Sequence, residues 1–244
     1  MPARKRRHDD ERIDLGEHSE TRFFGRRKGR PLRPQQALLL ETLLPRLAVD
    51  LSAPAPADLG TLFPDPVACT NLEIGFGGGE HLAAQAFAHP NTGFIGCEPF
   101  VNGMAKMLIA IQAKELRNIR LHFGDAIELL NWLPEASLAQ VDILYPDPWP
   151  KRRHWKRRII QDPSIVVLAR VLSPGGAVHF ATDIADYAAW VLERFMRSPS
   201  FEWAAERAAD WREPWNGYVP TRYEAKARRD GRVPNYFVFR RTAL

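Results

Sequence analysis

The sequence predicts an α/β protein built around a doubly wound, mostly parallel β-sheet. Between residues 69 and 196, short apolar segments alternate with segments of helical periodicity, which is typical of strands joined by crossover helices. The first of these strands runs into a glycine-rich turn, residues 75–79, which opens a helix. A last apolar segment, residues 236–240, follows a loop rather than a helix, so we predict one antiparallel strand near the C-terminus.

Each element is predicted from the periodicity of a short segment. Strands are expected where apolar or β-branched runs are bounded by turn residues, at 69–74, 93–97, 119–123, 141–145 and 177–182. Helices are expected where apolar residues recur at helical spacing, at 35–49, 80–88, 101–116, 125–132, 159–172 and 185–196. Pro45 is expected to kink or end the first of these helices.

The chain divides into three predicted parts. Residues 1–34 are rich in Arg and Lys and lack apolar periodicity, so we expect a basic arm that is flexible when free. Residues 35–66 comprise a helix with a leucine face and a Pro/Ala-rich linker. Residues 67–244 then form one α/β domain with its own core.

Composition favours an anionic partner and argues against a secreted or membrane protein. Lys and Arg number 34 against 29 Asp and Glu, and the basic residues cluster, which suits nucleic acid. The two cysteines, Cys69 and Cys97, form no CxxC pair, so neither a disulfide scaffold nor a metal site is expected. Apolar runs stay well short of the roughly 20 residues that a membrane helix needs, so we expect a cytoplasmic protein with no membrane association.

The glycine-rich turn predicts a nucleoside ligand without a diphosphate. Its pattern is E-x-G-x-G-x-G from Glu73 to Gly79, with Gly75 and Gly77 letting a ligand approach the backbone closely. In the dinucleotide fingerprint the third glycine would occupy position 80, where this chain has Glu80. Because a carboxylate there would repel a pyrophosphate, the turn fits S-adenosylmethionine better than NAD.

Acidic residues are expected at the ends of three predicted strands. Glu98 follows the second strand at the position where an acid accepts ribose hydroxyls. Asp125 follows the third strand and could accept from an adenine amino group, or could instead be a helix N-cap. Together with Glu73, these acids favour a nucleoside that carries a cationic centre.

Residues 141–158, VDILYPDPWPKRRHWKRR, combine an apolar strand, a proline-rich turn and a dense basic run. The turn places Asp147 and Trp149 at the carboxyl edge of the sheet, where ligands bind in open α/β folds. A plain structural turn followed by a solvated basic surface is the alternative. The adjacency of the two features favours chemistry on a nucleic-acid base, with the cations holding phosphates.

Several motifs resemble the bacterial tRNA (guanine-N7-)-methyltransferase family. They are LEIGFGGGEHL at Leu72, GCEP at Gly96, FGDA at Phe123, LYPDPWPKRRHWKRRI at Leu144, FATDIADYA at Phe180 and TRYEAKARRDG at Thr221. Two residues depart from the family pattern: Cys97, usually aliphatic, and Trp155, more often His. The resemblance implies a class I methyltransferase fold, Rossmann-like, over residues 67–244.

The resemblance also implies an activity and a set of site residues. The expected reaction moves a methyl group from S-adenosylmethionine to N7 of guanosine 46 in the tRNA variable loop. The protein is expected to need no metal and no obligate protein partner, and to be a monomer or a homodimer. The cofactor pocket would be lined by Glu73, Gly75, Gly77, Glu98, Asp125, Ala126 and Asp147. Substrate guanosine would contact Lys151, Asp183, Thr221, Arg222, Tyr223 and Glu224, and tRNA would contact Arg153, His154, Trp155, Lys156, Arg157 and Arg158.

Asp147 is the predicted catalytic residue. Guanine N7 has a free in-plane lone pair, so attack on a sulfonium methyl needs no strong base, only alignment and nearby negative charge. Asp147 would accept from the guanine edge and stabilise the growing positive charge, while Asp183 and Glu224 would hold N1–H and the amino group; Asp183 could instead be a helix N-cap. Two alternatives remain at this point: an amino-methyltransferase on another nucleobase or a protein side chain, and a non-catalytic RNA-binding module.

Overall fold

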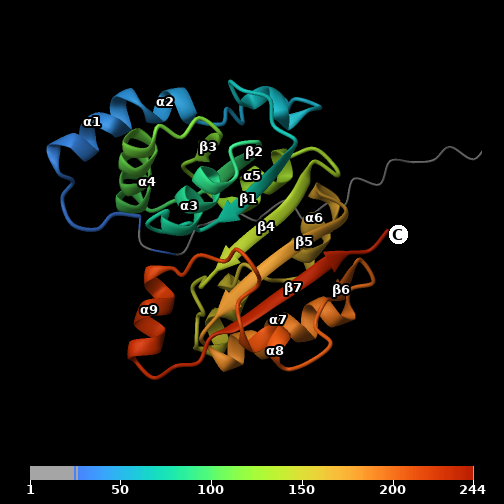
Figure 1. Ribbon diagram of the computed structural model, residues 1–244. Coiled ribbons are helices and arrows are strands. Elements are labelled where there is room, and N and C mark those ends of the chain that lie inside the picture. The colour runs from blue at the N-terminus through green and yellow to red at the C-terminus, as the bar shows by residue number, and fades with distance from the viewer. Residues whose placement is uncertain (1–24, 26, 244) are drawn as a thin grey trace, which may run out of the picture.

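A seven-stranded sheet forms the centre of the protein, with the strand order β3-β2-β1-β4-β5-β7-β6 (Figure 1). The computed structural model describes residues 25 and 27–243. The strands are β1 Cys69–Ile74, β2 Thr92–Cys97, β3 Ile119–His122, β4 Leu138–Leu144, β5 Leu172–Thr182, β6 Phe201–Trp203 and β7 Asn235–Arg241.

The strand directions confirm the predicted topology. Strands β1 to β5 pair in parallel, as the predicted crossover helices require, whereas β7 is antiparallel to both β5 and β6. In Figure 1 the arrow of β7 points opposite to those of β4 and β5. The carboxyl ends of the parallel strands therefore share one edge, which is where open α/β sheets bind ligands.

Helices cover both faces of the sheet. They are α1 Pro34–Thr42, α2 Leu44–Leu47, α3 Glu80–Ala88, α4 Val101–Lys114, α5 Ala126–Trp132, α6 Asp162–Val171, α7 Ala185–Arg197, α8 Ala209–Arg212 and α9 Arg222–Arg229, with 3₁₀ turns η1 Leu59–Leu62 and η2 Arg152–Arg157. Alternate strand residues enter two separate cores: Ile95 belongs to the core that includes residues of α5, α6 and α7, while its neighbour Phe94 belongs to the core that includes residues of α1, α3 and α4. This alternation follows from the two-residue side-chain period of a strand.

Several boundaries differ from the predictions for local physical reasons. The helix predicted at 35–49 is divided at Leu43, because Pro45 sits in the first turn of α2 and could not occupy a helix interior. The helix predicted at 159–172 starts only at Asp162, and Pro163 occupies its first turn. Strand β6 and helices α8 and α9 were not predicted, since they are short or largely polar and lack a clear apolar period.

Most of the predicted basic arm, residues 1–34, lies outside the described residues. The part that is described is fixed to the start of α4. The Arg27 carbonyl accepts from the Val101 N–H (3.0 Å), and the Asn102 side chain accepts from the Gly29 N–H (2.7 Å) and donates to the Arg30 carbonyl (2.8 Å). Within the described part of the chain, none of the helices has the length and apolar character needed to cross a bilayer.

Candidate active site

The glycine-rich turn between β1 and α3 has a backbone that only glycine adopts easily. Gly75, Gly77 and Gly79 have φ values of 72°, 57° and 78°, all in the left-handed region. A side chain at Gly79 would come within 2.3 Å of the Met107 sulfur, whereas a side chain at Gly75 would meet nothing within 4 Å. The turn is therefore packed against α4 at Gly79 and open at Gly75, where a ligand can approach the backbone.

Glu98, directly after β2, holds this turn in place. Its carboxylate accepts from the Gly77 N–H (2.6 Å) and the Phe100 N–H (2.9 Å). Burial raises the pKa of Glu98 to about 7, and the negative charge of Asp147 acts in the same direction, while the two backbone hydrogen bonds and Arg222 oppose the rise. Asp147 and Arg222 are thus near enough in space to influence the pKa of Glu98, although both are distant from it in sequence.

Asp125 and Asp147 follow β3 and β4 at the same edge of the sheet. Asp125 caps α5 by accepting from the Ile127 N–H (2.7 Å), so the N-cap alternative is realised, and Ala126 begins the helix. Burial raises the pKa of the Asp147 carboxyl. Glu98, Asp125 and Asp147 follow β2, β3 and β4 and so lie at the same edge of the sheet as the glycine-rich turn.

Asp147 lies between two residues with strained backbones. Tyr145, directly before the PDPWP turn, and Trp149, within it, have φ values of 51° and 44°. Non-glycine residues adopt this left-handed region at a cost of about 1–3 kcal/mol, and such strain concentrates at functional sites. The turn therefore presents Asp147 in a conformation that the surrounding structure must enforce.

Glu73 is buried and paired within the protein. Its carboxylate lies 2.9 Å from His81 Nδ1 of α3, and burial raises its pKa. Glu73, Asp142 and His179 stand opposite one another on β1, β4 and β5, with His179 Nδ1 3.1 Å from the Asp142 carboxylate. The sequence prediction missed this polar row, although its signal was there: single polar residues at alternate positions of apolar strands.

The first turn of α9 reaches the glycine-rich turn. A side chain at Gly77 would lie 3.0 Å from the ring of Tyr223 and 3.6 Å from Nη2 of Arg222. Figure 1 shows α9 at the end of the sheet where β4 and β5 finish. These two predicted substrate residues are thus brought beside the predicted cofactor loop by tertiary structure alone.

The side chains of Thr221 and Glu224 form hydrogen bonds within the protein. Thr221 Oγ1 accepts from the Glu224 N–H (3.2 Å) and caps α9. The buried Glu224 carboxylate accepts from the hydroxyls of Tyr218 (2.6 Å) and Tyr236 (2.8 Å) and from Arg228 Nε (2.8 Å). Although burial opposes ionisation, these bonds hold the pKa of Glu224 below its ordinary value. A role of Glu224 as a substrate ligand stays a prediction. To bind guanosine, its carboxylate would have to give up one of these hydrogen bonds for a bond to the base.

Asp183 and Lys151 lie at the ends of neighbouring segments. Asp183, after β5, accepts from Arg232 Nε at 2.5 Å, so its carboxylate is half of an ion pair. Lys151 is exposed directly before η2. Their contacts with a guanosine stay predictions.

The basic segment forms η2, and most of its cations face solvent. Arg152, Arg153 and Lys156 are exposed, whereas the ring of Trp155 packs edge-on against Trp190 of α7 at 5.2 Å. His154 contacts Trp149 edge-on at 5.8 Å, and the Arg157 guanidinium lies 5.0 Å from the same Trp149 ring. These contacts connect the basic segment to the turn that carries Asp147.

Arg158 contradicts the prediction of an RNA contact. Its side chain is 0% exposed, and it donates to the Pro148 carbonyl and to Asp186 of α7. A cation with no exposed surface cannot meet a phosphate in this structure. Sequence alone could not separate it from the neighbouring arginines, because burial is set by what packs over the segment.

Solved structures share this fold at low sequence identity. A 16S rRNA methyltransferase, KamB, aligns with a TM-score of 0.51 and 14% identity over 72% of this chain and 89% of that one. TrmN from Thermus thermophilus aligns with a TM-score of 0.50 and 17% identity over 74% of this chain and 46% of that one. These alignments confirm the predicted fold class, an α/β fold around a mostly parallel sheet.

Relatives in sequence are much closer. A family model described as "Putative methyltransferase" matches residues 67–235. The tRNA (guanine-N(7)-)-methyltransferase of Rhodopseudomonas palustris (strain BisB18) is 62% identical over 224 residues, which cover 92% of this chain and 89% of that protein. The protein of the same name from Rhizobium meliloti (strain 1021) is 58% identical over 226 residues, which cover 93% and 97%. With its motifs, its fold and these relatives in agreement, the chain belongs to the tRNA (guanine-N7-)-methyltransferase family.

Proposed function

We propose that this protein transfers a methyl group from S-adenosyl-L-methionine to N7 of a guanine in tRNA, at guanosine 46 of the variable loop. The observation that carries the proposal is the placement of Asp147. It follows β4 on a strained turn, its charge is felt by Glu98 of the glycine-rich turn, and the basic segment begins four residues later. The names of the relatives support the same reaction.

The residues around the glycine-rich turn fit S-adenosylmethionine. Space is open at Gly75, and the acids Glu98 and Asp125 stand at the next two strand ends. The Glu80 carboxylate folds against Gly78, within 2.6 Å of where a side chain there would begin, so a diphosphate would meet negative charge at the start of α3. We infer that Gly75, Gly77, Glu98, Asp125, Ala126 and Asp147 hold the cofactor, while the Glu73 carboxylate, paired with His81, links β1 to α3. When bound, S-adenosylmethionine supplies a methyl group activated by its sulfonium charge.

Asp147 orients the guanine and stabilises charge. Because N7 carries a free lone pair, no proton has to leave before the methyl group is accepted. A carboxylate beside the base accepts a hydrogen bond from its edge and stabilises the positive charge that the ring gains. We assign Lys151, which precedes η2, Asp183, which follows β5, and Arg222 and Tyr223 of α9 to guanosine binding.

The exposed cations of η2 bind the tRNA backbone in this proposal. Arg152, Arg153 and Lys156 face solvent next to the Asp147 turn, with His154, Trp155 and Arg157 among them. A variable-loop guanine must be turned out of its stack, which costs a few kcal/mol that phosphate contacts offset.

The test combines product mapping with one substitution. Unmodified tRNA incubated with the protein and methyl-labelled S-adenosylmethionine should yield 7-methylguanosine at one variable-loop nucleotide. Asp147→Ala, with an unchanged circular dichroism spectrum and assayed at saturating S-adenosylmethionine, should lose at least 100-fold in kcat, as expected when a charge-stabilising group is removed. Methylated amino groups in the product would instead support an amino-methyltransferase. Near-wild-type turnover of Asp147→Ala would rule out the catalytic role of Asp147.

A further inference from the structure

Arg158 is a fully buried cation at the end of a solvated basic segment. The preceding Arg152, Arg153 and Lys156 are exposed, but the Arg158 side chain has 0% exposure. Taking a guanidinium out of water is costly unless charge and hydrogen bonds compensate it. Its surroundings therefore have to explain why an arginine, and not an apolar residue, occupies this position.

Two hydrogen bonds connect Arg158 to the turn that carries Asp147 and to α7. Arg158 Nε donates to the carbonyl oxygen of Pro148, the residue after Asp147, at 2.8 Å. Arg158 Nη2 donates to Asp186 Oδ2 in the first turn of α7. Because proline has no N–H, the carbonyl is the only backbone group of Pro148 that can form a hydrogen bond.

Three aromatic rings enclose the same guanidinium. Its central carbon lies 4.8 Å from the ring centroids of Trp155 and Tyr187 and 5.0 Å from that of Trp190. Such cation–π contacts strengthen when the cation is shielded from water. Arginine suits this site because its flat group can stack on rings while its N–H groups bond in the plane.

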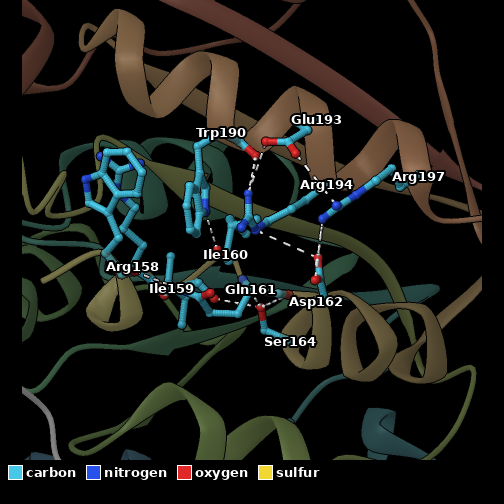
Figure 2. A network of polar contacts seen from close by, with 11 residues as sticks. Arg158, Ile159, Ile160, Gln161, Asp162, Ser164, Trp190, Glu193, Arg194 and Arg197 are labelled. Carbon is cyan, nitrogen blue, oxygen red and sulfur yellow. Dashed lines mark hydrogen bonds and ion pairs between the residues drawn. The ribbon is translucent and has the colours of Figure 1, made fainter. Parts of the chain in front are cut away.

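The enclosure itself is anchored to α7 and to the start of α6. Trp190 Nε1 donates to the Ile160 carbonyl at 2.8 Å, and the Gln161 side chain donates to the carbonyls of Trp155 (2.7 Å) and Arg158 (3.1 Å). Figure 2 shows Arg158, Trp190 and residues 159–162 in one network that continues to Arg194 and Arg197. Arg158 is thus held from several sides and has one rigid link to Pro148.

We propose that Arg158 is a positioning residue for Asp147. It holds the strained PDPWP turn through the Pro148 carbonyl, so that the Asp147 carboxylate keeps its orientation toward the methyl acceptor while the exposed cations beside it bind tRNA. This inference rests on the proposed role of Asp147. It replaces the sequence-based assignment of Arg158 as a phosphate contact.

The test separates turnover from tRNA binding. Arg158→Lys keeps the charge but cannot stack and donate to both partners, so kcat should fall about 10- to 100-fold, as small misplacements of catalytic groups do. Its apparent KM for tRNA and the slope of log(kcat/KM) against log salt should not change. The exposed control Lys156→Ala should behave in the opposite way, with kcat kept, a higher KM and a salt slope reduced by about 1.

Two further variants guard against misfolding. Asp186 has a side chain 54% exposed, so Asp186→Asn should fold normally and still lower kcat, by less than Arg158→Lys does. In Arg158→Ala, added methylguanidinium should restore part of the lost kcat, whereas Lys156→Ala should show no such rescue.

The outcomes distinguish this inference from the proposed function. If Arg158→Lys raises KM and lowers the salt slope at unchanged kcat, Arg158 contacts RNA and the inference fails. If both the Arg158→Lys and Asp186→Asn proteins turn over at the wild-type rate while Asp147→Ala is inactive, the inference alone fails. If Asp147→Ala is itself active, the proposed catalytic role fails, and the positioning role with it.

Discussion

Glu98 is a buried acid whose protonation depends on its neighbours. Burial is the main reason that its pKa rises to about 7, and the hydrogen bonds from Phe100 and Gly77 reduce the rise without cancelling it. The unliganded protein therefore holds a proton on Glu98 below about pH 7. A sulfonium cation in the pocket would favour the carboxylate, so binding and proton release are linked.

The first prediction is that S-adenosylmethionine binds more tightly as the pH rises from about 6 to 8, by at most about tenfold per unit. Calorimetry in buffers of different ionisation enthalpy should detect proton release on binding below pH 7. S-adenosylhomocysteine, which lacks the positive charge, should show a smaller rise. An affinity for S-adenosylmethionine that does not change with pH in the wild type, or a rise that persists in Glu98→Gln, would refute the linkage.

The stability of the unliganded protein should follow the opposite trend. Since the folded state binds the Glu98 proton more tightly than the unfolded state, the unfolding free energy should fall as the pH rises from about 4.5 to about 7. Urea denaturation across this range should show the fall in the wild type and a weaker one in Glu98→Gln.

The turn between β1 and α3 shows how much an element boundary can depend on one glycine. Gly79 is the N-cap of α3 with φ 78°, and a side chain there would come within 2.3 Å of the buried Met107 sulfur. Gly175, within β5, has nearly the same φ, 79°, but nothing within 4 Å of where its side chain would begin. Comparing alanine substitutions at the two glycines therefore separates the free-energy cost of the positive φ from the cost of crowding Met107.

Gly175→Ala should therefore lower the unfolding free energy by about 1–2 kcal/mol, the cost of placing a non-glycine residue in the left-handed region. Gly79→Ala should lose about 1–3 kcal/mol more, because it also crowds the core against α4. Urea denaturation of both variants measures the difference. Equal losses would show that Met107 yields freely and that only the backbone conformation matters.

At the scale of the whole molecule, residues 215–229 connect the C-terminal half of the sheet to the glycine-rich turn. The Trp215 ring lies 4.3 Å from that of His179 on β5, and Gln85 of α3 donates to the Gly217 carbonyl at 2.7 Å. From these anchors the chain continues to Tyr218, which bonds to Glu224, and into α9 beside Gly77. The candidate site is complete only while this segment is docked.

Trp215→Ala should loosen this segment without unfolding the sheet. Hydrogen exchange of residues 215–229 should become faster, and affinity for S-adenosylmethionine should fall roughly tenfold if the docked population falls to about a tenth. Trp203→Leu is the control, because Trp203 lies on edge strand β6 and contacts Phe237; it should lower stability but leave cofactor affinity unchanged. Unaltered exchange or affinity in Trp215→Ala would mean that the segment is held mainly by other contacts.

The sequence by itself determined the alternation of strands and helices from β1 to α7, the glycine-rich turn, the acids at the strand ends and the basic segment after the PDPWP turn. Strands β1 and β2 and helix α3 fall at or within one residue of their predicted bounds, because local periodicity and turn residues act within short stretches of chain. The family motifs added the reaction, since chemistry needs particular residues at particular spacings.

Only the tertiary structure decided which side chains are free to act. Among the six arginines and lysines of residues 151–158, Arg158 alone is buried, because Tyr187 and Trp190 of α7 pack over its guanidinium. Glu224 and Thr221 likewise carry the predicted motif but are engaged with Tyr218, Tyr236 and α9. Burial and pairing depend on residues distant in sequence, so no local pattern could have distinguished these side chains from exposed ones.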